Sequence, residues 1–205
     1  MSVKICGVKT LEAAKKAAEN GADFVGIIMV PNRQRSIDPD AAKQISAYLR
    51  GLPEPRPKLV GVFRNQELDH VIAMQKEIPL DFVQLHGSEP LSWVDQIPTS
   101  VIKRVVPSSP DFVEQVLALK KFQKSVFALI DSEMGGDGKV FDWSPLGDIA
   151  KSGGQYILAG GLNPENVASA LQQPGCIGVD VSGGVETDGA KDMQKIQLFL
   201  QNARQ

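Results

Sequence analysis

Short apolar runs alternate with segments of helical spacing eight times along the 205 residues. The runs predict strands over 3–6, 24–29, 59–63, 82–86, 101–106, 126–131, 156–161 and 177–182. Nearly continuous apolar character is typical of parallel strands that are covered on both faces. One strand and one helix in about 26 residues is close to the shortest unit of this kind. We therefore predict an α/β protein, a single (β/α)8 TIM barrel with one domain over residues 1–205.

The intervening segments complete this pattern. They predict helices over 11–19, 38–50, 67–76, 91–96, 111–121, 143–151, 164–172 and 192–203. An open doubly wound sheet has the same local alternation, but the first strand-to-helix turn lacks the G-x-G-x-x-G sequence and eight regular units favour a closed barrel. The proline-rich stretch 52–57 is interpreted as a helix-to-strand turn on the non-catalytic face, not as a domain boundary.

Charge and composition exclude several functional classes. The net charge of -2 provides no basic field for nucleic acid or an anionic membrane. No apolar run reaches the roughly 20 residues of a membrane span, and the first residues lack the layout of a secretory signal. Cys6 and Cys176 are too few for a disulfide framework or a thiolate zinc site. We expect a cytoplasmic enzyme with free thiols that binds neither nucleic acid nor membrane.

Paired glycines end the last two predicted strands, at Gly160-Gly161 and at Gly183-Gly184. Glycine lets main-chain N–H groups approach a ligand closely, and the positive end of a following helix favours an anion. Asn163 is suited to cap such a helix, with a proline at its first position. Each pair could simply end a strand, but two such turns after strands seven and eight match the usual phosphate site of a TIM barrel.

Reactive groups of a TIM barrel belong at the carboxyl ends of its strands. This position is occupied by Cys6, His86, Asp131 and Asp180, and Arg35 lies in the second loop. Taken alone, Cys6 could be a buried structural thiol and Asp131 a loop cap. Together, a thiol and a carboxyl facing each other over a phosphate cradle make an acid–base pair. Because side chains alternate along a strand, Lys4 is expected directly beneath Cys6.

The sequence argues against a metal. A divalent site of imidazoles and carboxylates usually takes two or more histidines, and one of the two present, His70, falls in the third helix outside the barrel. His86 is interpreted as a neutral, hydrogen-bonded strand-end residue. The planar guanidinium of Arg35 suits a substrate carboxylate. The glycine-rich loop 132–140 is a candidate lid.

Five motifs, at residues 4–7, 84–87, 135–143, 159–167 and 179–186, read KICG, QLHG, GGDGKVFDW, AGGLNPENV and VDVSGGVE. In this order and spacing they resemble the motif set of the phosphoribosylanthranilate isomerase family, and the phrasing around residues 31–33 and 131–133 is most similar to the single-function fungal members. The resemblance covers essentially the whole chain.

The resemblance implies a TIM barrel enzyme of tryptophan biosynthesis. It would convert N-(5-phosphoribosyl)anthranilate, a small phosphorylated aminosugar, to its 1-deoxyribulose isomer by an Amadori rearrangement without cofactor or metal. It implies that Cys6 is the general base, Asp131 the general acid, and Arg35 the residue that meets the anthranilate. His86 and Asp180 would bind the substrate. The phosphate would lie on a glycine-rich set comprising Gly136, Gly138, Gly160, Gly161, Ser182, Gly183 and Gly184.

The implied chemistry fits these residue types. Asp131 would protonate the furanose oxygen as the ring opens to an iminium, and a Cys6 thiolate would then remove the C2′ proton. Nearby positive charge, from Lys4 or the iminium, should favour the thiolate. Two departures from the family pattern, Asp137 in the loop and Gly183 in place of a common serine, do not touch this pair.

Two other functions remain open at this point. A Schiff-base lyase or aldolase acting on a sugar phosphate would use Lys103 on the fifth strand. A non-catalytic sugar-phosphate binding barrel would keep the cradle alone. For the isomerase we expect a monomer.

Overall fold

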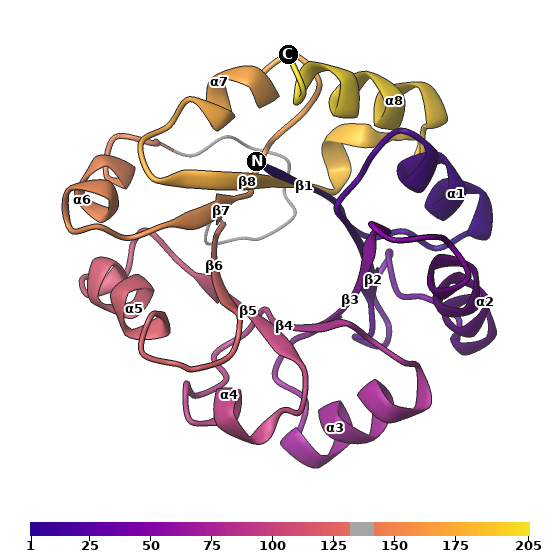
Figure 1. Ribbon diagram of the computed structural model, residues 1–205, viewed down its shortest axis with the longest axis horizontal. Coiled ribbons are helices and arrows are strands. Elements are labelled where there is room, and N and C mark those ends of the chain that lie inside the picture. Colours follow the sequence, from indigo (N-terminus) through magenta and orange to yellow (C-terminus); the bar gives the residue numbers. More distant parts are fainter. Residues whose placement is uncertain (132–141) are drawn as a thin grey trace.

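Eight parallel strands close into a barrel in the computed structural model, which describes residues 1–131 and 142–205. The strands form a ring with the helices outside it (Figure 1). They are β1 Ser2–Ile5, β2 Phe24–Ile28, β3 Lys58–Phe63, β4 Phe82–Leu85, β5 Ser100–Val105, β6 Val126–Ile130, β7 Tyr156–Leu158 and β8 Cys176–Val181. The predicted (β/α)8 barrel is confirmed, with strand ends within a few residues of the predicted ones.

The helices follow the predicted order. They are α1 Leu11–Glu19, α2 Pro39–Arg50, α3 Leu68–Glu77, α4 Trp93–Gln96, α5 Phe112–Leu119, α6 Leu146–Lys151, α7 Val167–Leu171 and α8 Met193–Asn202. Thr10 caps α1 as expected, since its hydroxyl accepts a hydrogen bond from the Ala13 N–H at 3.2 Å. None of the helices within residues 1–131 and 142–205 combines the length and apolarity needed to cross a membrane.

Two predicted helix starts are wrong, and the first is that of the helix expected from Trp143, which begins at Leu146. The helix expected from Pro164 begins at Val167 instead. Asn163 still caps this segment, because its Oδ1 accepts hydrogen bonds from the N–H groups of Glu165 and Asn166, both at 3.0 Å. The chain therefore makes one capped turn before the helix proper.

An antiparallel hairpin after β8 was not predicted. A 3-10 turn, η1 Gly183–Val185, leads into β9 Glu186–Thr187 and β10 Ala190–Lys191. Asp188 and Gly189 between them both have positive φ, 53° and 78°. Two such residues are typical of the tight turn that joins hairpin strands.

Alternation along the strands separates two packing layers. Outward-facing residues such as Val3 and Ile5 pack beneath the helices in the larger hydrophobic cluster. Inward-facing rings fill the amino-terminal part of the barrel, where Phe24 packs edge-on against Phe82 with centroids 5.3 Å apart and Phe127 stacks on Phe82 at 5.9 Å. These rings close the floor of the barrel, so polar inward-facing residues are confined to the carboxyl-terminal half.

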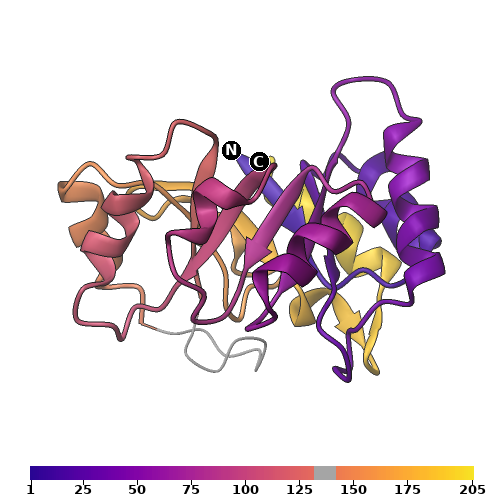
Figure 2. The ribbon, with the colours of Figure 1, turned by 90° about the horizontal axis from the view of Figure 1, so that it is seen from below.

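The two chain ends lie close together on the side where β1 begins (Figure 2), and the Arg204 Nη1 donates to the Met1 carbonyl at 3.1 Å. At the seam, β1 pairs with β8 so that Lys4 stands beside Asp180. The opposite end of the barrel, where the strands finish, carries the loops that surround the candidate site.

Candidate active site

A cavity of about 370 Å³ lies at the carboxyl ends of the strands. Six of the residues predicted from the sequence line it, and they are Cys6, Arg35, His86, Asp131, Asp180 and Ser182. They come from the ends of β1, β4, β6 and β8 and from the loop after β2. Closing the barrel therefore brings together side chains that are far apart in the sequence.

Cys6 directly follows β1, and its side chain reaches the cavity although the residue is only 5% exposed. Lys4 is fully buried on the same face, with its Nζ 3.0 Å from Asp180 Oδ1. Gly26 of the neighbouring strand leaves room for both, since a Cβ there would lie 2.8 Å from Cys6 Sγ and 3.0 Å from Lys4 Nζ. The expected position of Lys4 beneath the thiol is confirmed.

Burial decides the protonation of this thiol. It raises the pKa of Cys6 above the ordinary value, although Lys4 acts to lower it. For Lys4 itself burial acts to lower the pKa, but the Asp180 carboxylate and Cys6 outweigh it and the pKa is raised. Lys4 therefore keeps its positive charge and stabilises the Cys6 thiolate. In the unliganded protein this stabilisation is smaller than the effect of burial on the pKa of Cys6.

Asp131 lies on the other side of the cavity, directly after β6, and is 5% exposed. His86 follows β4, and its Nε2 lies 3.4 Å from Asp131 Oδ2. The His86 Nδ1 lies 3.1 Å from the Gln84 Nε2. With that amide as donor, Nδ1 accepts and Nε2 carries the hydrogen toward Asp131. His86 is therefore a hydrogen-bonded residue at the strand end, as expected.

Arg35 enters the cavity paired with a residue that the sequence analysis did not assign to the site. Its Nε and Nη2 donate to the Glu186 carboxylate at 2.7 and 2.8 Å. Lys191 Nζ also lies 2.7 Å from Glu186 Oε1. Although burial acts to raise it, the pKa of Glu186 is lowered because both cations hydrogen-bond to the carboxylate. The unpredicted hairpin thus supplies two charged residues beside the cavity.

The paired glycines lie beside the cavity and not among its lining residues. Gly183 and Gly184 line an adjoining hollow of about 520 Å³ together with Asn163. Gly160 and Gly161 have φ of 84° and 67°, so both occupy backbone conformations that favour glycine. A Cβ at Gly184 would collide with the Leu162 carbonyl, so the turns after β7 and β8 are in close contact.

Part of the predicted phosphate site is not described by the structure. Gly136, Gly138 and the whole candidate lid lie outside the described residues, as does Asp137.

Lys103, the residue of the Schiff-base alternative, points away from the Cys6 cavity. Its Nζ donates to the Gly87 carbonyl at 2.8 Å and lies 3.1 Å from Glu89 Oε2. Burial lowers the pKa of Lys103, against the pull of Glu89. It lines a separate hollow of about 750 Å³, so it does not face the thiol or Asp131.

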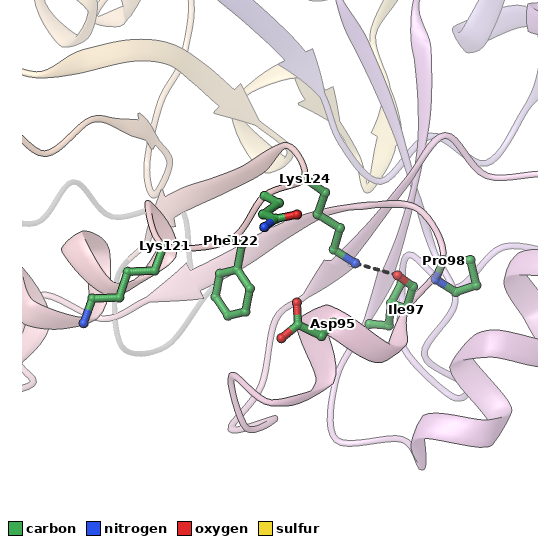
Figure 3. A pocket seen from close by; sticks show the side chains of 7 residues that line it. Asp95, Ile97, Pro98, Lys121, Phe122 and Lys124 are labelled. Atoms are coloured by element: carbon green, nitrogen blue, oxygen red, sulfur yellow. Dashed lines mark hydrogen bonds between the residues drawn. The ribbon is translucent and has the colours of Figure 1, made fainter.

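A third hollow, of about 610 Å³, lies at the amino ends of β5 and β6 (Figure 3). There Lys124 Nζ donates to the Ile97 carbonyl at 2.5 Å. It contains none of the predicted site residues and lies at the end of the barrel opposite Cys6. Within residues 1–131 and 142–205, no group of three or more His, Cys, Asp or Glu is arranged to hold a metal ion.

Comparisons with known proteins found matches along the whole chain. Residues 3–202 match the family model described as N-(5'phosphoribosyl)anthranilate (PRA) isomerase. The N-(5'-phosphoribosyl)anthranilate isomerase of Zygosaccharomyces bailii is 45% identical over 207 residues, which cover 98% of this chain and 97% of the relative.

Solved structures of phosphoribosyl anthranilate isomerases are also similar to this chain over its whole length. The crystal structure of phosphoribosyl anthranilate isomerase from Thermotoga maritima superposes with a TM-score of 0.86 at 40% identity, covering 100% of this chain and 98% of that one. Another crystal structure, of the isomerase in complex with reduced 1-(O-carboxyphenylamino)-1-deoxyribulose 5-phosphate, gives a TM-score of 0.82 at 38% identity, covering 100% and 98%.

Proposed function

This chain belongs to the N-(5'-phosphoribosyl)anthranilate isomerase family, and on that premise we propose which of its residues carry the reaction. The enzyme isomerises N-(5'-phosphoribosyl)anthranilate, a small phosphorylated substrate, in tryptophan biosynthesis. The fungal character expected from the motifs is confirmed by the relative from Zygosaccharomyces bailii.

One observation supports the assignment of the acid and the base. Cys6 and Asp131 line the same cavity, although one follows β1 and the other follows β6 on a distant part of the ring. A substrate between them would present one side to a thiol and the other to a carboxyl group. Two proton-transfer groups on opposite sides of a reacting carbon–nitrogen unit are what this isomerisation requires.

The proposed steps need only proton transfers. Asp131 gives its proton to the furanose oxygen, the ring carbon–oxygen bond breaks, and the nitrogen lone pair forms the iminium. The positive iminium makes the C2′ proton acidic, and the Cys6 thiolate removes it to leave an enolamine. The Cys6 thiol then gives a proton to C1′ of the enolamine, and the C2′ hydroxyl gives its proton to the Asp131 carboxylate as the ketone forms, so both groups return to their starting states. Because the thiol is protonated in the unliganded site, arrival of the iminium is the step that should favour its ionisation.

Other residues would orient the substrate. Glu186 occupies two of the five donor positions of Arg35, and the rest can meet the anthranilate carboxylate. His86 and Asp180 would hold hydroxyl groups near the reacting carbons. Ser182 and the glycine turns after β7 and β8, with Gly136 and Gly138, would hold the phosphate by main-chain N–H groups.

Two substitutions test the acid–base assignment. We expect Cys6→Ala and Asp131→Asn each to lower turnover by at least about a hundredfold with little change in substrate affinity. The measurement is the fluorescence decrease as phosphoribosylanthranilate is consumed, supported by complementation of a tryptophan auxotroph that lacks this isomerase. Near-normal turnover of either variant would remove that residue from its role.

Three broader expectations remain part of this proposal. We propose that residues 1–205 fold as one domain, that the protein is a monomer, and that it is located in the cytoplasm. The monomer is supported by the described surface, where Met1 and Leu198 are the large hydrophobic residues that are exposed. Light scattering of the purified protein measures the mass directly, and a dimer mass would refute the monomer. Cell fractionation tests the location.

A further inference from the structure

Lys191 has a buried, positively charged side chain, and the proposed reaction steps assign no role to it. The hairpin of β9 and β10 brings it back over the end of β8, where its side chain is 5% exposed. Its Nζ donates to the Ser182 carbonyl at 2.8 Å and to Glu186 Oε1 at 2.7 Å, and it lies 3.4 Å from Ser182 Oγ. Burying an ammonium group is costly, so a residue in this position is held by specific partners.

Lys191 also lies next to the backbone that carries the proposed base. A Cβ at Gly7, the residue after Cys6, would lie 3.5 Å from Lys191 Nζ and 2.9 Å from Arg35 Cδ. The electrostatic influence is mutual: Lys191 acts to lower the pKa of Cys6, and Cys6 acts to raise the pKa of Lys191, which burial lowers overall. Lys191 is therefore a close charged neighbour of the thiol.

The charges around Cys6 do not cancel. Lys4 on β1 is paired with Asp180 on β8, which leaves no net charge. Arg35 and Lys191 share the single carboxylate of Glu186, which leaves one positive charge. Asp131 and His86 face the thiol from across the cavity, whose rim also holds Arg33 and Arg64. Within the two ion-paired groups next to Cys6, three cations therefore face two carboxylates, and Lys191 is the cation that the hairpin contributes.

We propose that Lys191 is a positioning residue of the isomerase, which holds Glu186 against Arg35 and supplies the positive charge that favours the thiolate of Cys6. This inference rests on the proposed role of Cys6 as the base. It assigns a function to the hairpin, which otherwise takes no part in the barrel. It also predicts opposite shifts in the ionisation of Cys6 for two variants, because removing Lys191 takes away a positive charge and removing the charge of Glu186 takes away a negative one.

The test measures thiol ionisation without turnover. Alkylation of Cys6 by iodoacetamide is followed against pH, with peptide mass spectrometry to separate Cys6 from Cys176. Lys191→Met should raise the midpoint by about one pH unit, as expected for loss of a nearby charge. Glu186→Gln should lower it, and Lys191→Arg should keep the wild-type midpoint. Lys16→Met is the matched control, because this lysine donates to Gln197 on the helical layer, away from the cavity, and its loss should change nothing.

An unchanged midpoint in folded Lys191→Met, or shifts of the same sign in both variants, would overturn the proposal. If circular dichroism shows that Lys191→Met does not fold, the test rests on Glu186→Gln. An unchanged or raised alkylation midpoint in Glu186→Gln would then contradict the proposal. In the same variants, the turnover lost by Lys191→Met should be partly recovered at higher pH. A failure of the base assignment would appear separately, as normal turnover of Cys6→Ala.

Discussion

Lys4 Nζ lies 3.0 Å from Asp180 Oδ1, at the seam where the first and last strands of the barrel meet. The register of β1 against β8 sets the two residues side by side. Lys4 has no exposed surface, and Asp180 is 8% exposed at the bottom of the cavity. The ion pair holds a cation beneath Cys6, and it also joins the first and last strands of the barrel. The same contact therefore affects both the stability of the barrel and the charge around Cys6.

Removing one partner of this pair should be costly. We expect Lys4→Met to lower the free energy of unfolding by about 3–5 kcal/mol, because it leaves a buried carboxylate without its counter-charge. Urea denaturation followed by circular dichroism measures the change. The double variant Lys4→Met/Asp180→Asn, which removes both charges, should recover part of the loss.

The pH dependence of this contribution has a definite sign. The pKa of Lys4 is raised above 10.5, so the stabilisation is complete below pH 10.5 and is lost as the pH rises through the raised value. The difference between wild type and Lys4→Met should therefore shrink in strong alkali. A difference that grows as the pH rises through the raised pKa of Lys4 would contradict the ion-pair explanation.

We expect His86 to affect turnover through its contact with Asp131. We expect His86→Asn to lower turnover about tenfold, less than Asp131→Asn, because the carboxyl group of Asp131 remains in place but loses the neighbour that orients it at 3.4 Å. Steady-state kinetics on the two variants gives the comparison. The exposed His70 on α3 provides the control, and His70→Asn should behave as wild type. A loss as large as that of Asp131→Asn would make His86 the acid instead.

The positions of Cys6 and Asp131 could be predicted because they depend on local rules. Each follows a short apolar run, and in a closed parallel barrel all such strand ends meet at one mouth. No knowledge of the register was needed. The same reasoning placed Lys4 beneath Cys6.

The ion pairs could not be predicted in this way. Arg35 and Glu186 are 151 residues apart, and their contact depends on how two loops fold over the mouth. The hairpin that carries Glu186 had a signal in Asp188-Gly189, a pair typical of tight hairpin turns, but strands of two residues give no hydrophobic pattern. The start of α7 shows a third limit: the cap at Asn163 was recognisable, whereas the extra turn before the helix also has a long-range contact, since Asn202 Nδ2 of α8 donates to the Pro164 carbonyl at 2.8 Å.

Asp81 should stabilise the barrel without affecting catalysis. It accepts two hydrogen bonds from the Arg56 guanidinium and one from the Leu59 N–H, all at 2.8 Å, on the side of the barrel away from the cavity. We expect Asp81→Asn to cost about 2 kcal/mol of unfolding free energy, typical of lost hydrogen bonds to a charged group, with turnover unchanged. Thermal and urea unfolding measure the cost, and the exposed Glu54→Gln, which removes another Arg56 partner, should have little effect.

This contribution should be lost in acid. Although burial acts to raise it, the pKa of Asp81 is lowered below 3.8 because Arg56 and the Leu59 N–H stabilise the carboxylate. The stabilisation is therefore complete above pH 3.8 and is lost as the pH falls through the lowered value. The stability difference between wild type and Asp81→Asn should shrink below that pH, and a difference that grows there would be contrary to this assignment.

Gly184 offers a test of the proposed phosphate site that is separate from the proposed acid–base pair. A methyl group there would collide with the Leu162 carbonyl, so Gly184→Ala must push apart the turns that follow β7 and β8. We expect a cost of about 1–3 kcal/mol in stability, as for other overpacked sites, and a raised KM with a smaller change in kcat. Gly147→Ala is the control, because it lies in α6 with nothing within 4 Å of the added methyl group and should stabilise the helix by about 0.5–1 kcal/mol. A wild-type KM in folded Gly184→Ala would mean that the phosphate is held elsewhere, since no close turn geometry would then be required for its binding.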